Sequence, residues 1–187
     1  MAEAPWLLEP VLERVAWILR SHQAAFGRPL IAAARRLPAS AEGWRTLAQE
    51  LFAADRVVLA HDGASAEGDP GPRLIYANRA ALTLWGRTWG EMVGLPSRLT
   101  AEPGERAGRA AALRQALQQE AIAHYSGVRI DRHGRRFLIR GARLWSLRDG
   151  AGNRCGQAAS FSDWTRLAVP PDGAEVRRMH QGSGGPA

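Results

Sequence analysis

The stretch "RLIYANRAALTLWGRTWGEMVGLPSRLTAEP", residues 73–103, places a short strand, a helix and a Gly- and Pro-rich segment in immediate succession. Its apolar start, residues 73–77, is typical of a buried strand. Asn78 then favours a helix start, because its side-chain oxygen accepts from the free N–H groups of a first turn. The helix is expected to bury Trp85 and to end at Gly86. The segment that follows predicts short helical turns over a sheet.

Upstream of this stretch the pattern is mainly helical. Apolar residues recur at helical spacing through residues 5–26, which predicts an amphipathic helix. Two interpretations remain for it: packing on the domain, or dimerisation. A second helix is expected at about residues 44–54, with Ser40 several residues early for its cap, followed by a strand at 56–62. The segment "GASAEGDPGP" is then a loop that joins this strand to the strand at 73–77.

Downstream, the residues 102–125 contain an Ala-rich helix with Leu113, Leu117 and Ala121 on one stripe. Three antiparallel strands then run to Trp164, separated by the turn signals "DRHGR" and "RDGAGN", and "DWTRL" closes the sheet. Strict alternation in the middle strand puts the following residues on one apolar face, interrupted by Arg143: Phe137, Ile139, Gly141, Trp145 and Leu147.

This order of elements predicts an α+β fold, with a five-stranded antiparallel sheet, helices on one face and an additional N-terminal amphipathic helix. Such an arrangement encloses a pocket between helices and sheet. The expected organisation is a helical extension at 1–43, the α+β domain at 44–167, and a flexible tail at 168–187.

Composition sets outer limits on function. The chain has 187 residues and a net charge of +7, and arginine is its only strongly basic residue type because lysine is absent. The single cysteine, Cys155, excludes an intramolecular disulfide. The sequence has no apolar run of the ~20 residues that a membrane span needs, nor a signal peptide, so a cytoplasmic protein is expected. Nucleophile-elbow, P-loop and dinucleotide motifs are absent too, so we expect no enzymatic activity.

The runs "YANRAALTLWG", "WGEMVGLPS" and "DWTRL" resemble the corresponding motifs of PAS domains. More narrowly, "ANRAALTLWG", "LPSRLTAEP", "RRFLIRGARLW" and "GQAASFSDW" resemble the MEKHLA domain, a PAS-related family that occurs as small bacterial proteins and at the C-terminus of some plant transcription factors. The resemblance spans roughly residues 44–167. It implies a sensory or protein-interaction role, with the short helices after the second strand forming the lid of a cavity.

The candidate cavity residues combine this resemblance with the strand pattern. Arg143 is the most informative, because a buried arginine must be paired or reach water and so could meet an anionic ligand; the alternative is that a bulge or its long stem takes it outward. Trp85 and Trp145 could stack on a planar ligand or simply form core. The full candidate set is Asn78, Trp85, Ser97, Arg98, Tyr125, Arg143 and Trp145.

Known PAS cofactors find little support in the residues. The resemblance places Ser97 where flavin-binding light sensors have their reactive cysteine, and a hydroxyl does not form the flavin–thiol adduct. His124 is the nearest candidate for an axial haem ligand, but a lone histidine at an element boundary is more often a surface or capping residue. The five histidines show no metal-binding spacing. The cofactor therefore stays open.

Three functions follow as hypotheses. The first is a sensory module that binds a small molecule and signals through an unidentified partner protein. The second is a pure interaction module that dimerises through the N-terminal helix, around Trp6, Leu8, Val15 and Leu19. The third, nucleic-acid binding, draws only on a cluster of arginines that more commonly marks a solvated sheet edge: Arg129, Arg132, Arg135, Arg136, Arg140 and Arg143. Ligand, partner, oligomeric state and stimulus are not specified by the sequence.

Overall fold

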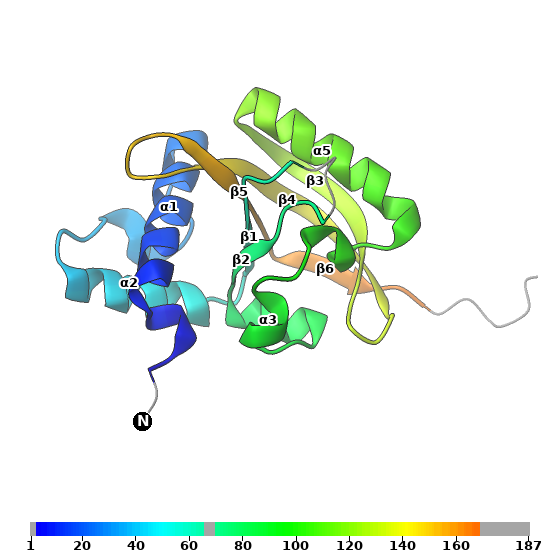
Figure 1. Ribbon diagram of the computed structural model, residues 1–187, viewed down its shortest axis with the longest axis horizontal. Helices are drawn as coiled ribbons and strands as arrows, with labels where there is room; N and C mark the ends of the chain where they lie inside the picture. The colour runs from blue at the N-terminus through cyan, green and yellow to red at the C-terminus, as the bar shows by residue number, and fades with distance from the viewer. Residues whose placement is uncertain (1–2, 66–69, 169–187) are drawn as a thin grey trace, which may run out of the picture.

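The computed structural model describes residues 3–65 and 70–168, and a single antiparallel sheet lies at its centre (Figure 1). The strands lie in the order β2-β1-β5-β4-β3. The sixth strand, β6, pairs with residues 137–140 of β4, whereas β5 pairs with residues 143–148 of the same strand. Their bounds are β1 Val57–Asp62, β2 Leu74–Ala77, β3 Ala121–Ile130, β4 Arg136–Arg148, β5 Arg154–Phe161 and β6 Asp163–Arg166. The expected tail at 168–187 lies, except for its first residue, outside the described residues.

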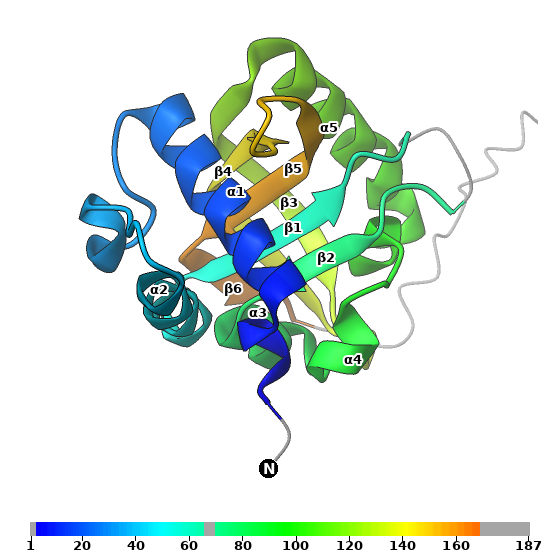
Figure 2. The ribbon, with the colours of Figure 1, turned by 60° about the vertical axis from the view of Figure 1, so that its left-hand side comes forward.

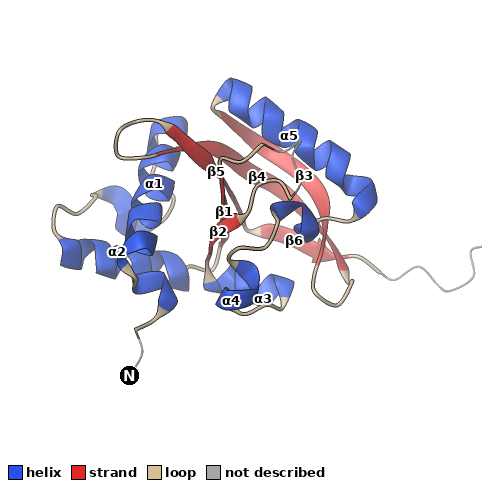
Figure 3. Ribbon diagram, in the orientation of Figure 1, coloured by secondary structure: helices blue, strands red, loops and turns tan. Residues whose placement is uncertain are grey.

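The helices divide between the two faces of this sheet. Figure 2 shows α1 crossing one face beside α2, whereas α3, α4 and α5 lie on the other side in Figures 1 and 3. The expected sheet, with helices on one face and an additional N-terminal helix, is therefore present. Helix α2 packs on the same face as the N-terminal helix α1. The bounds are α1 Glu9–Phe26, α2 Ala41–Ala53, α3 Arg79–Trp85, α4 Trp89–Met92 and α5 Arg106–Gln119.

Local capping explains where these helices begin and end. Ser40 accepts from the N–H of Gly43 and starts α2 directly, so the expectation that Ser40 stands several residues too early is wrong. Asn78 caps α3 as predicted, and Gly86 ends it in the left-handed conformation. Thr88 forms a capping box with Glu91 at the start of α4.

Two apolar cores lie on the two faces of the sheet. The outer core packs α1 and α2 against the sheet and buries Val15, Ile18 and Leu19 completely or nearly so. The inner core packs Trp85 of α3 and Met92 of α4 against the other face. The apolar stripe of α1 is thus part of the domain's own core.

Strand β4 changes the direction of its side chains at a bulge. Residues 139 to 142 of β4 lie opposite residues 127 to 125 of β3, and Gly141 takes a φ of 62°. Phe137 and Ile139 before the bulge belong to the inner core, whereas Trp145 after it belongs to the outer core. The strict alternation expected along this strand is wrong, because one extra residue reverses the faces beyond Gly141.

The helix expected within 102–125 is shorter than the sequence suggested. Helix α5 ends at Gln119, Glu120 takes a φ of 64°, and β3 begins at Ala121. Ala121 therefore pairs with Trp145 in the sheet and is not part of a helical stripe. Trp164 of β6 is 39% exposed, and its ring contacts Phe137 at a ring-centroid distance of 6.1 Å. None of the helices in the described part of the chain is long and apolar enough to span a bilayer.

Candidate functional site

The candidate site is a small cavity of about 50 Å³ between the inner face of the sheet and Trp85. At this size it holds roughly two water molecules, at about 30 Å³ each. Apolar side chains dominate its walls, and a few polar groups reach it. The lining residues are Leu59, Ala60, His61, Leu74, Trp85, Thr100, Tyr125, Arg129, Ile139, Leu144, Gln157, Ala158, Ala159 and Phe161. The predicted lid is therefore present, with Trp85 of α3 in it, and forms the roof of the cavity.

One side of the cavity is built by β3. Tyr125, Gly127 and Arg129 alternate along this strand, and the Tyr125 hydroxyl accepts from Nη2 of Arg129 at 3.0 Å. The guanidinium also lies over the tyrosine ring, 5.4 Å from its centroid. A Cβ at Gly127 would stand 2.6 Å from the Tyr125 hydroxyl oxygen. Glycine is therefore what allows the tyrosine–arginine pair to lie flat on the strand.

Trp85 contributes both an apolar surface and a hydrogen-bond donor. Its ring packs edge-on against Phe137 and Phe161 and is 1% exposed. The indole Nε1 is buried and makes no hydrogen bond within the described residues. A buried donor without an acceptor carries a desolvation cost of about 1–3 kcal/mol. This cost would be recovered if a ligand or an ordered water accepted from it.

The predicted site residues separate into distinct groups. Trp85 and Tyr125 line the cavity together. Ser97 is fully buried in the turn after α4, its hydroxyl without a hydrogen-bond partner among the described residues, next to the cavity residue Thr100. Arg98 points away to the loop before β2, where its Nη1 donates to the carbonyl of Pro70 at 2.8 Å.

Asn78 is fully buried but has a structural set of contacts. Its Oδ1 accepts from the N–H groups of Val58 and Ala81, and its Nδ2 donates to the carbonyl of Arg56 at 2.7 Å and more weakly to those of Leu51 and Ala54. Every hydrogen-bonding atom of the side chain is thereby used to join α2, β1 and α3. The side chain has no capacity left for a ligand.

Arg143 and Trp145 lie on the outer face because of the bulge at Gly141, and the cavity lining includes neither. Nη1 of Arg143 lies 3.3 Å from Nε2 of His22, and its guanidinium stacks over Phe26. The His22 ring meets Trp145 edge-on. Burial lowers the pKa of His22 to about 4, against a raising effect of its hydrogen bond to the Arg28 carbonyl, so the ring is neutral at physiological pH.

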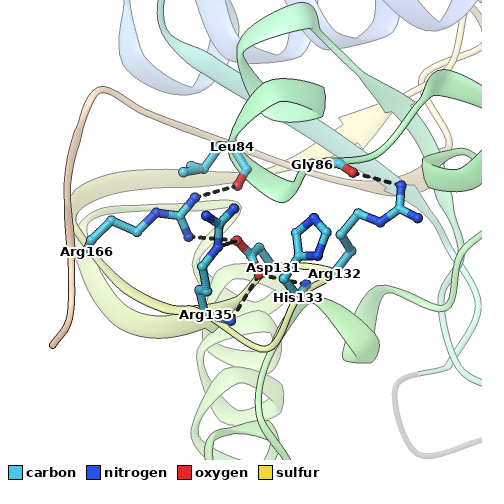
Figure 4. A network of polar contacts seen from close by, with 7 residues as sticks. All are labelled: Leu84, Gly86, Asp131, Arg132, His133, Arg135 and Arg166. Atoms are coloured by element: carbon cyan, nitrogen blue, oxygen red, sulfur yellow. Dashed lines mark hydrogen bonds and ion pairs between the residues drawn. The ribbon is translucent and has the colours of Figure 1, made fainter. Parts of the chain in front are cut away.

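The turn between β3 and β4 fastens the cavity roof to the sheet (Figure 4). Asp131 accepts from the backbone N–H groups of His133 and Arg135, from Nε of Arg135, and from Nη1 of Arg166. Burial would raise the pKa of Asp131, but these hydrogen bonds outweigh it and lower the pKa. The carbonyls that end α3 accept from the same region: Leu84 from Arg166, Trp85 from the Arg132 N–H, and Gly86 from the Arg132 side chain.

The basic cluster on β3 and β4 is interrupted by acidic partners. Among its six arginines, Arg129 is buried, and Arg143 contacts His22. The remaining members pair with carboxylates, as Arg132–Glu91, Arg135–Asp131, Arg136–Glu102 and Arg140–Asp163. These pairs neutralise most of the strip that a nucleic acid would meet.

The residues do not fit the cofactors of related folds. A tricyclic flavin ring exceeds the volume of the cavity, and Ser97 supplies no thiol. His124 is exposed in a left-handed bulge of β3 and is not among the lining residues. Within the described ranges, no group of three or more His, Cys, Asp or Glu residues could hold a metal ion.

Sequence reasoning missed the polar groups that do line the cavity. From the sequence, Arg129 is grouped with a solvated arginine cluster and neither His61 nor Gln157 is named as a cavity residue, yet His61 in β1 pairs with Gln157 of β5 and all three line the cavity. The signal for Arg129 was present in the alternation Tyr125, Gly127, Arg129, which puts all three side-chain positions on one face of a strand.

Solved structures define the class of fold. The PAS domain of a protein from Colwellia psychrerythraea matches with a TM-score of 0.54 and 14% identity, over 66% of this chain and 95% of that one. A light-oxygen-voltage domain studied with a flavin analogue matches with a TM-score of 0.50 and 20% identity, over 66% and 85%. An RNA-binding light-oxygen-voltage receptor gives 0.51 and 22%, over 62% of this chain and 31% of the receptor. The fold is therefore that of a PAS domain.

The family model of the MEKHLA domain matches residues 12–166, and the chain belongs to this family. No curated protein matches the sequence. The matched region includes most of α1, in keeping with the burial of that helix in the outer core.

Proposed function

We propose that this protein is a sensory module that binds a small molecule in the inner cavity and signals through a partner protein. The observation that carries the proposal is the composition of the cavity wall, which is largely apolar with a few convergent polar groups. Trp85, Tyr125 and Arg129 come from two elements of the fold, so an occupant would contact both the roof and the sheet.

The contacts of the roof suggest how occupancy would be transmitted. Trp85 ends α3, and the carbonyls of this helix end are bound by Arg132 and Arg166. A displacement of Trp85 by a ligand would therefore act on the β3–β4 turn and on β6, at the end of the described chain. The ligand would favour whichever arrangement it binds more tightly.

Native mass spectrometry of the purified protein, together with a thermal-shift screen of metabolites, tests the proposal. A co-purifying molecule or a raised unfolding temperature is expected. Ala159 lies between its strand partners Leu59 and Leu144 in the sheet wall of the cavity, so Ala159→Leu should fill the cavity and abolish the shift. Arg114→Gln, at an exposed position of α5, should retain the shift. A wild-type protein that carries and binds nothing would reject the proposal.

A second candidate, an interaction module that holds no ligand, is favoured by the small cavity volume of about 50 Å³. Val15 and Leu19 of the suggested dimer face are buried in the outer core, but Leu8 is 44% exposed. This candidate predicts that Leu8→Glu converts a dimer into a monomer. Sedimentation that is identical for the wild type and this variant would reject dimerisation through Leu8.

A further inference from the structure

Arg129 is the residue of the cavity wall whose charge is not accounted for. Its side chain reaches the cavity while the residue is only 7% exposed. Among the side chains that the structure describes, none of the ion pairs includes Arg129. A buried charge without a counter-charge is costly, and natural proteins generally pair such a group or place it against a ligand.

Two hydrogen bonds fix the position of the Arg129 guanidinium and leave its other N–H groups available to a ligand. Nη1 donates to the Val128 carbonyl at 2.7 Å and Nη2 to the Tyr125 hydroxyl at 3.0 Å. These two bonds occupy two of the five N–H groups of an arginine. Both acceptors are neutral, so they fix the position of the charge without neutralising it. Gly127 lies between the two residues on the strand, and its lack of a Cβ leaves room for the contact between the Tyr125 hydroxyl and the guanidinium.

A second donor of the same cavity lacks an acceptor. The buried Nε1–H of Trp85 makes no hydrogen bond within the described residues. It is carried by the roof, whereas Arg129 is carried by the sheet. An occupant that accepts hydrogen bonds and carries negative charge would satisfy both groups, while a neutral hydrocarbon would satisfy neither.

We infer that the ligand of this cavity is a small monocarboxylate, with its oxygens bound to Arg129 and within reach of the Trp85 N–H. This inference rests on the proposed ligand-binding function and narrows it to one chemical class. A planar carboxylate matches the fork of a guanidinium. The rest of the wall, with Leu59, Ile139 and Leu144, suits a short aliphatic group, and the volume of about 50 Å³ restricts the chain to a few heavy atoms.

Isothermal titration calorimetry with formate, acetate, propionate and butyrate tests this inference, with chloride and phosphate as inorganic anions and acetamide and propionamide as neutral isosteres. One of the carboxylates should bind at one site, at least ten-fold more tightly than its amide and than either inorganic anion. Arg129→Gln should abolish that preference, and Trp85→Phe, which keeps the aromatic surface, should weaken binding by a smaller factor. Arg114→Gln is the matched control and should bind as the wild type does.

Arg129→Gln is expected to fold, because it removes an uncompensated buried charge, and its circular dichroism spectrum verifies this. Equal binding of amide and carboxylate, or full retention of the preference in Arg129→Gln, overturns the monocarboxylate inference while leaving a ligand-binding cavity in place. Chloride or phosphate binding as tightly as the carboxylates also overturns it, as a non-selective anion site. If no carboxylate binds but Ala159→Leu abolishes binding of a neutral metabolite, the inference fails and the sensory proposal stands.

Discussion

Nε2 of His22 lies 3.3 Å from Nη1 of Arg143, and this contact joins α1 to β4 across the outer core. His22 is fully buried, and its Nδ1 lies 3.1 Å from the carbonyl oxygen of Arg28. Nδ1–H therefore donates to the carbonyl, and the unprotonated Nε2 accepts from Arg143. Protonation of the ring would turn this acceptor into a donor facing an arginine.

We predict that stability falls as the pH is lowered through the titration of His22. Burial lowers the pKa of His22 in the folded protein to about 4 from the ordinary 6.5. Between these two pH values the unfolded chain therefore binds a proton at His22, whereas the folded chain does not. The stabilisation is complete above pH 6.5 and is lost progressively as the pH falls to about 4, by about 3 kcal/mol in total. Urea unfolding measured at intervals between pH 4 and 7.5 checks this.

The control for this prediction is His22→Gln, which has no titrating ring at the same position. Its stability should be lower at pH 7.5, and its dependence on pH between 6.5 and 4 should be shallower than that of the wild type. Parallel curves for the two proteins would show that another group is responsible.

Asp131 supports a second prediction, because its fully buried carboxylate accepts from both Arg135 and Arg166 (Figure 4). Asp131→Asn would set an amide N–H group against these donors and leave the arginines without a counter-charge. We expect a loss of about 2–4 kcal/mol in the free energy of unfolding. Asp163→Asn, at an exposed ion pair with Arg140, should cost less than about 1 kcal/mol. Equal losses in the two variants would contradict this.

The sequence was sufficient for the fold where local chemistry decides the outcome. Asn78 and Gly86 carry their capping roles in their own side chain and backbone, and the antiparallel strands follow from alternation and turns. The sequence was insufficient to place the side chains of β4, because the bulge at Gly141 depends on how β4 pairs with β3. Arg143 and Trp145 were therefore expected in the cavity that Arg129 in fact lines. Long-range strand register is a property of two segments together.

Asn78 gives a third prediction, since its side chain bonds to α2, β1 and its own helix at once. Asn78→Ala should lower the free energy of unfolding by about 2–4 kcal/mol, because it removes a helix cap and leaves buried backbone groups unpaired. Asn78→Asp should not rescue it, because a carboxylate keeps the acceptor but faces the Arg56 carbonyl with negative charge. Ser40→Ala, which removes one exposed cap, should cost about 1 kcal/mol. Chemical denaturation of the four proteins decides the order.

Gly156 of β5 gives the last prediction, because the strand packs tightly against β1 at this position. A Cβ added there would overlap the backbone carbonyl oxygen of His61, and a backbone atom within a sheet cannot turn aside as a flexible side chain can. Gly156→Ala should therefore destabilise the protein by about 3 kcal/mol and shift the end of β1 that carries His61. Gly150→Ala, in the open turn between β4 and β5 with nothing near its added Cβ, should stay within about 0.5 kcal/mol of the wild type. If Gly156→Ala unfolds at the same denaturant concentration as Gly150→Ala, β1 and β5 are not in the close register that forms this wall of the cavity.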